Sequence, residues 1–132
     1  METIAVRSEE RDQFIDITDR VRRAAEAAGL TDGALLLYVP HTTAGITVNE
    51  GADPSVARDL QADLARLVPR EQPDYRHREG NSSSHTRASL VGSNQGVMVE
   101  GGRLVLGTWQ AIFFCEFDGP RQRKVYLKAL PA

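Results

Sequence analysis

The run from 109 to 117, WQAIFFCEF, limits the fold most, because apolar residues occupy both faces of the strand it would form. Side chains of a β-strand alternate between its two faces. One face would carry Trp109, Ala111, Phe113, Cys115 and Phe117, and the other Ile112 and Phe114. Such a strand must be covered on both sides. It predicts the centre of a β-sandwich, or a sheet with one face against another subunit, and it makes Trp109 a core residue.

Short strand-like segments with turn residues between them fill much of the remaining chain. Together with 109–118, such segments lie near 3–8, 12–17, 34–39, 46–48, 87–92, 96–100, 103–108 and 122–130. Gly101-Gly102 predicts a tight hairpin turn, and 118–120 (DGP) turns the chain into its last strand. Short spacing of this kind is typical of antiparallel sheets.

Two segments carry helix signals. In the first, Thr18 is a candidate N-cap, alanines follow, and Gly29 is a candidate C-terminal stop. In the second, Asp53 is a candidate N-cap, and apolar residues recur at helical spacing until Pro69. Residues 70–86 are polar and irregular, which predicts a long loop of the kind that often carries function.

Composition and pattern together predict one globular domain. The 132 residues are 41% hydrophobic and carry a net charge of −2, which suits one core and gives no strong field for nucleic acid or an anionic membrane. Cys115 lies in an apolar run, so we expect a buried, unreactive thiol in a reducing compartment. No leader-like or membrane-spanning segment is recognisable, so we expect a cytoplasmic protein. The predicted fold is a single α+β domain over 1–132, a two-layer antiparallel β-sandwich with two helices.

The three histidines are the main candidates for chemistry. His41, His77 and His85 lie in or beside segments rich in Gly, Ser, Thr and Asn, not on an apolar periodic face. Imidazole can bind a metal or transfer a proton near neutral pH, and three imidazoles with an open fourth position suit zinc. Their spacing matches no established zinc motif, so three solvated loop histidines are the alternative.

Other polar residues near the histidines extend the candidate site. Glu50 follows the apolar strand 46–48 without a structural role, which makes it a candidate general base, with a solvated loop glutamate as the alternative. Segment 80–87 (GNSSSHTR) is rich in hydroxyls and amides, and Arg87 has the forked geometry that holds phosphate. A flexible polar loop is the alternative there. The basic residues of 121–124 are interpreted as solvated charges at a sheet edge.

These segments resemble the YjbQ family, part of which is described as secondary thiamine-phosphate synthases. The matching motifs are HTTAGITVNE over 41–50 followed by Asp53-Pro54, then His77 with Glu79-Gly80, then His85, SLVGS over 89–93, Gly101, and LGTWQ over 106–110. The similarity covers nearly the whole chain. It implies a sandwich-type α+β fold that assembles as a homotrimer with pockets between subunits.

The resemblance also implies a site at the motif positions. Its catalytic residues would be His41, Glu50, His77 and His85, and the three histidines would be the metal ligands. The polar residues expected to bind substrate or anion are Thr42, Thr43, Asn49, Asn81, Arg87 and Gln110. Histidine ligands suit zinc or a similar divalent ion, with magnesium as the alternative. The expected partner is a small phosphorylated metabolite.

The activity implied by the resemblance joins an aminopyrimidine diphosphate to a thiazole phosphate and releases pyrophosphate. Two alternatives stay open. One is a different metal-dependent hydrolase or lyase at the same histidines. The other is a trimeric module that binds a small anionic metabolite or a metal without turnover.

Overall fold

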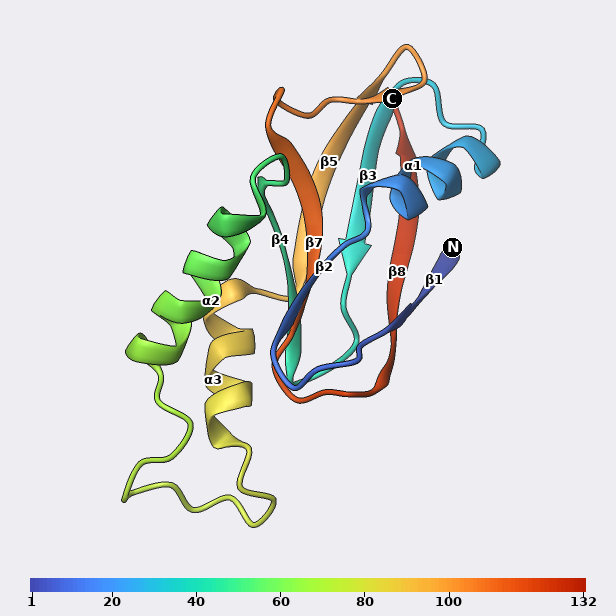
Figure 1. Cartoon of the computed structure of the whole chain (residues 1–132). Helices are drawn as coiled ribbons and strands as arrows, with labels where there is room; N and C mark the ends of the chain where they lie inside the picture. Colours follow the sequence, from blue (N-terminus) through green and yellow to red (C-terminus); the bar gives the residue numbers. More distant parts are fainter.

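The computed structural model describes all 132 residues, which form two antiparallel sheets and three helices (Figure 1). One sheet has five strands in the order β1-β8-β3-β5-β6, and the other has three in the order β2-β7-β4. The strands are β1 (Glu2–Arg7), β2 (Gln13–Asp16), β3 (Gly33–Tyr38), β4 (Ala44–Glu50), β5 (Asn94–Glu100), β6 (Arg103–Leu104), β7 (Gln110–Glu116) and β8 (Gln122–Pro131). The helices are α1 (Thr18–Ala27), α2 (Pro54–Leu67) and α3 (Ser82–Val91). The α+β sandwich is confirmed, with one helix more than the sequence predicted.

Strand β7 is the centre of the three-stranded sheet, as its two apolar faces predicted. Ile112 and Phe114 belong to the main core of 17 buried residues between the two sheets. Phe113 and Cys115 belong to a second cluster that packs beneath α2 and α3 (Figure 1). Both faces of β7 are therefore covered within one chain. The prediction of a core Trp109 is wrong: this residue precedes β7 and is 63% exposed.

Two helix boundaries follow from local hydrogen bonds. The Asp53 carboxylate accepts the backbone N–H of Ser55 at 2.9 Å, so the predicted cap of α2 is confirmed. The hydroxyl and N–H of Ser55 lower the pKa of Asp53 because they stabilise its ionised form. Helix α1 begins one residue earlier than predicted, because Thr18 is helical and its N–H donates to Asp16 at 2.9 Å. Gly29, with a φ of +69°, follows the end of α1 as expected.

Helix α3 is the main correction, because the sequence predicted a loop over 70–86 and a strand over 87–92. Its buried face is mostly polar, so the sequence shows no run of apolar residues at helical spacing that would predict it. The Ser84 hydroxyl donates to the Phe117 carbonyl at 2.6 Å, and Arg87 donates twice to the Val68 carbonyl. These tertiary hydrogen bonds hold the polar part of this face, and Ala88 and Val91 pack against the second apolar cluster. Gly92, with a φ of +101°, follows the end of the helix.

The remaining strand predictions hold with changed boundaries. Gly101 and Gly102, with φ values of +58° and +75°, form the tight turn between β5 and β6, as predicted. The strand predicted over 103–108 is wrong beyond Leu104, because β6 has only two residues. None of the three helices combines the length and the apolar character needed to cross a membrane.

The fold brings three loops together at one end of the sandwich, the lower end in Figure 1. These are the loop before β4, the long loop before α3, and the turn after β7. The N–H of Phe117 donates to the Thr43 carbonyl at 3.2 Å, which ties two of them together. Gly45 allows α3 to approach β4, because a Cβ at this position would lie 2.7 Å from the Gly92 carbonyl oxygen. The polar segments singled out by the sequence meet here.

Candidate functional site

A cavity of about 380 Å³ lies where the three loops meet, and all three histidines line it. Its volume suits a small metabolite. His41 comes from the loop before β4, His77 from the loop before α3, and His85 from the first turns of α3. The other polar residues that line it include Thr42, Thr43, Glu79, Asn81, Asp118, Arg121 and Arg123. We call this cavity the charged cavity.

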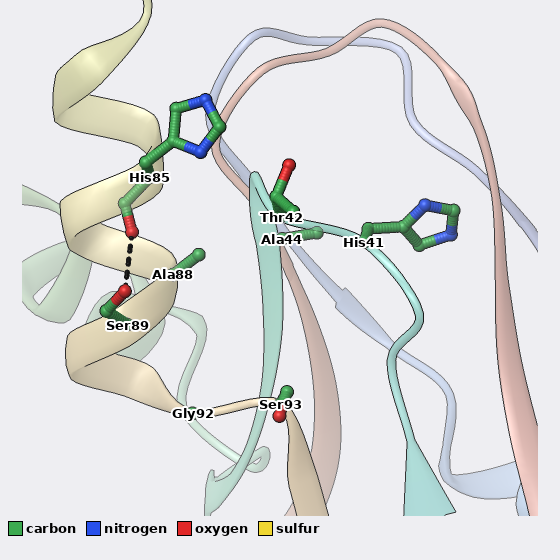
Figure 2. A pocket seen from close by; sticks show the side chains of 8 residues that line it. All are labelled: His41, Thr42, Ala44, His85, Ala88, Ser89, Gly92 and Ser93. Atoms are coloured by element: carbon green, nitrogen blue, oxygen red, sulfur yellow. Dashed lines mark hydrogen bonds between the residues drawn. The ribbon is translucent and has the colours of Figure 1, made fainter.

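A second cavity of about 470 Å³ adjoins the first, between α3 and the start of β4 (Figure 2). His41, Thr42 and His85 line both cavities. The remaining lining of the second cavity is small: Ala44, Ala88, Ser89, Gly92 and Ser93. We call it the small-residue cavity. Figure 2 shows the His85 ring at its rim, on the side of α3 that faces Thr42.

His41 is held in one orientation by the backbone of β8. Its Nε2 accepts the N–H of Lys124 at 3.0 Å, and Figure 2 shows its ring turned away from α3. Burial lowers the pKa of His41, and the nearby Arg123 guanidinium lowers it further. The neutral ring therefore carries its proton on Nδ1, because Nε2 accepts. This nitrogen is the ring's only proton donor.

The predicted three-histidine metal set does not fit this arrangement. A neutral imidazole has one nitrogen lone pair, and that of His41 already accepts the Lys124 N–H. No three His, Cys, Asp or Glu side chains of the chain group closely enough to hold a metal ion. His41, His77 and His85 therefore do not form a shared metal site.

His77 and His85 form a pair inside the charged cavity. Their ring centroids are 5.3 Å apart, and the rings meet edge to face at 89°. Next to them, the Asn81 amide donates to Asp118 at 2.8 Å, and Asp118 accepts from Arg121 at 3.0 Å. Asn81 is buried, and its amide oxygen has no hydrogen-bond partner. The arrangement places two imidazoles and one guanidinium around a single concave surface.

A buried ion pair supports the loop that carries His41. Glu116 is fully buried and accepts from the Arg123 guanidinium at two oxygens and from the Ser8 hydroxyl at 2.7 Å. Arg123 also donates to the Thr43 hydroxyl at 2.8 Å. Burial by itself raises the pKa of Glu116, but these hydrogen bonds and that from the Asp118 N–H outweigh it, so the pKa lies below its usual value.

The sequence missed this pair and misjudged Arg123 as a solvated edge charge. A signal was available. Alternation places Glu116 on the same face of β7 as Ile112 and Phe114, and a charge on a core face needs a partner. Arg123 likewise alternates with Val125 on the buried face of β8.

Several predicted residues lie outside the two cavities. Glu50 and Asn49 end β4, and a seven-residue strand places them roughly 20 Å from its start. Glu50 lines a separate cavity, and Gln110, which pairs with it across the sheet, accepts the Gly107 N–H at 2.7 Å. Arg87 is buried, with its guanidinium bound to Val68 and Asp12, so it is not free to hold a phosphate. Thr43 lines the charged cavity, but its hydroxyl is bound to Arg123.

Comparisons with known proteins agree along the whole chain. A family model described as UPF0047 protein YjbQ-like matches residues 2–132. The UPF0047 protein YugU of Bacillus subtilis is 49% identical over 130 residues, 98% of each chain. The UPF0047 protein MJ1081 of Methanocaldococcus jannaschii is 46% identical over 125 residues, 95% of this chain and 90% of that one.

Solved structures agree as well. A YjbQ/UPF0047 family protein from Clostridium acetobutylicum has a TM-score of 0.95 at 49% identity and covers 98% of this chain and 100% of its own. A YbjQ-like protein of unknown function from Sulfolobus solfataricus has a TM-score of 0.93 at 30% identity, over 99% of this chain and 96% of its own. Sequence and fold thus lead to the same conclusion: the chain belongs to the YjbQ (UPF0047) family.

Proposed function

We propose that this chain is an enzyme that acts on a small phosphorylated metabolite at the two adjoining cavities. The specific reaction is the one implied by the resemblance, in which an aminopyrimidine diphosphate and a thiazole phosphate form thiamine phosphate. The observation that supports it is the His77–His85 pair, which shares the charged cavity with Arg121. Imidazolium and guanidinium groups are suitable partners for a departing diphosphate.

From the protein, the reaction needs charge stabilisation and a proton more than it needs a covalent bond to a side chain. The ring nitrogen of the thiazole attacks the methylene carbon of the aminopyrimidine, and a carbon–nitrogen bond forms. The carbon–oxygen bond to the diphosphate breaks, and pyrophosphate leaves with the electron pair. A protonated imidazole of His77 or His85 donates its proton to the departing oxygen, and Arg121 binds the charge that develops there.

The proposed assembly is a homotrimer, and one exposed surface supports contact between subunits. Leu36 and Tyr38 of β3, Met98 of β5 and Leu130 of β8 are each at least 41% exposed. Strand register places Met98 and Leu130 on either side of Ala34, on the face that carries Leu36. Several exposed apolar side chains on one sheet face are typical of an interaction surface. Sedimentation equilibrium should give three times the chain mass, and a monomer would refute the assembly.

The test of the activity is direct formation of product. Purified protein is incubated with both substrates, and thiamine phosphate is measured after oxidation to its fluorescent derivative. H85Q and H77Q should each lower the rate by about 100-fold, the usual contribution of a positioned proton donor. R66Q is the matched control, because Arg66 is an exposed arginine on α2 outside both cavities.

Three results would contradict the proposal in different ways. Absence of thiamine phosphate with the wild-type protein refutes the specific reaction. Release of phosphate from one substrate alone indicates a hydrolase instead. Tight binding of a substrate without any turnover indicates a binding module.

A further inference from the structure

The two cavities share three residues but differ in charge. We infer that they are two subsites for one ligand with two parts: the charged cavity binds its phosphate or diphosphate, and the small-residue cavity binds its uncharged ring. This inference rests on the proposed function for the choice of site. It concerns binding, however, so it can be tested without turnover.

The charged cavity has the groups that bind an anion. Arg121 is half exposed at its wall, and His77 and His85 line the same cavity. Asn81 lines it as well, at the start of α3, and its amide nitrogen donates to Asp118. Guanidinium and imidazole N–H groups are suitable donors to phosphate oxygens.

The buried Asn81 is a second, independent sign of a ligand at this position. It is 7% exposed and lines the charged cavity, and its amide oxygen lacks a partner. Leaving a buried acceptor unpaired costs about 1–3 kcal/mol. A hydroxyl of a phosphate group or an N–H of a ligand at this wall of the cavity would provide the missing donor. The position thus suits a ligand with both acceptors and a donor.

The arginines of this cavity are already paired, which gives the imidazoles a defined part. Arg121 pairs with Asp118, and Arg123 pairs with the buried Glu116. His77 and His85 line the cavity, and the ring N–H group of each can donate to a phosphate oxygen.

The small-residue cavity has the opposite character. Apart from the shared His41 and His85, no charged or titratable side chain lines it. Ala44, Ala88 and Ser89 leave room beside α3 for a ring of the size of a pyrimidine. An uncharged heterocycle loses little hydration there and keeps polar contact with the serine hydroxyls and the backbone.

The shared residues mark the point where the two parts of the ligand join. His85 and Thr42 belong to both cavities, whereas His77 belongs to the charged cavity alone. The bond between ring and phosphate therefore lies next to His85. The two imidazoles therefore have different roles. His85 is the proton donor to the bridging oxygen, and His77 contacts the terminal phosphate oxygens.

Nuclear magnetic resonance of the imidazoles tests the inference, because each of the three histidines gives its own side-chain signal. Inorganic pyrophosphate should shift the signals of His77 and His85. The unphosphorylated aminopyrimidine alcohol should shift His85 and leave His77 unchanged. Isothermal titration calorimetry should give the affinity of each probe for the protein and its variants.

Two variants assign each probe to its cavity. R121Q should weaken pyrophosphate binding by about tenfold, the loss expected for one charge-assisted contact, and leave binding of the alcohol unchanged. S89L should block the alcohol and leave pyrophosphate binding unchanged, because Ser89 is exposed and lines only the small-residue cavity. R66Q should change neither affinity.

The inference is overturned if both probes shift the same histidines, or if each variant weakens both probes equally. These outcomes differ from failure of the proposed function. If the two probes act on different cavities as expected but the protein makes no thiamine phosphate, the two subsites are supported and the reaction is refuted. If the protein forms the product but both probes act on the same cavity, the reaction is supported and the two subsites are refuted.

Discussion

Replacing Glu116 by glutamine tests whether the buried ion pair supports the site. The carboxylate is fully buried and accepts hydrogen bonds from Ser8, Arg123 and the Asp118 N–H. E116Q keeps the shape of the side chain but removes its charge and turns one acceptor into a donor. The new amide N–H group faces the N–H groups that donate to the second carboxylate oxygen in the wild type. The Arg123 charge also stays buried without compensation.

The expected cost follows from the pair's complete burial. Breaking a buried ion pair by removing one partner costs about 3–5 kcal/mol, and the amide oxygen of E116Q preserves part of the hydrogen bonding. We therefore expect a loss of about 3 kcal/mol at pH 7. For a domain of this size that corresponds to a fall of about 10 °C in Tm.

The pH dependence gives the effect a second signature. The pKa of Glu116 in the folded chain lies below 4.5, its ordinary value. The charged carboxylate therefore stabilises the fold fully above pH 4.5, and this contribution disappears as the pH falls through the folded-state pKa. The difference in stability between wild type and E116Q should consequently narrow below pH 4.5.

Urea unfolding at pH 7 and at pH 3.5, followed by circular dichroism, measures both effects. D63N is the matched control, because Asp63 pairs with Arg66 on the exposed surface of α2 and should change the free energy of unfolding by less than about 1 kcal/mol. If E116Q and D63N lose equal stability at pH 7, or if the gap for E116Q widens in acid, the ion pair does not have the role assigned to it.

Three further predictions concern other parts of the chain. Burial and the nearby Arg123 lower the pKa of His41, so its signal should titrate below pH 6.5 with the proton on Nδ1 in long-range ¹H–¹⁵N spectra; titration above 6.5 would contradict its burial beside Arg123. G45A should lower stability by about 1–3 kcal/mol in urea, since its methyl group would meet the Gly92 carbonyl, whereas G96A, which meets nothing within 4 Å, should not. Burial raises the pKa of the Cys115 thiol, so native protein should resist a thiol reagent that labels it rapidly in urea; equal rates would contradict its burial.

The fold was predictable where burial follows an apolar period. The alternation in β7, the glycine turn after β5 and the Asp53 cap of α2 each depend on contacts close in sequence or on one repeated pattern. Helix α3 was not, because serines and an arginine occupy its buried face. Their partners, such as the Phe117 carbonyl, lie far away along the chain.

The candidate site was predictable in part, for a similar reason. Polar segments without a structural role pointed to the histidines, and the fold places all three around the charged cavity. Glu50 shares a motif with His41 but not a cavity, because a straight strand separates them. Arg87 was misjudged because the sequence does not show that a distant buried carbonyl occupies its guanidinium, whereas Arg123 was misjudged although strand alternation places it on a buried face.

The polar docking of α3 has a consequence for how sharply a ligand is recognised. A helix that packs through an apolar face can shift slightly, because apolar contacts form again after a small displacement. Hydrogen bonds are lost when donor and acceptor move apart. The contacts of Ser84 with the Phe117 carbonyl and of Arg87 with the Val68 carbonyl hold α3 at one position against the ends of β7 and α2, and thus limit the space beside it. The wall that α3 contributes to both cavities therefore has a defined position. A ligand too wide for the space beside it can enter only if those hydrogen bonds break.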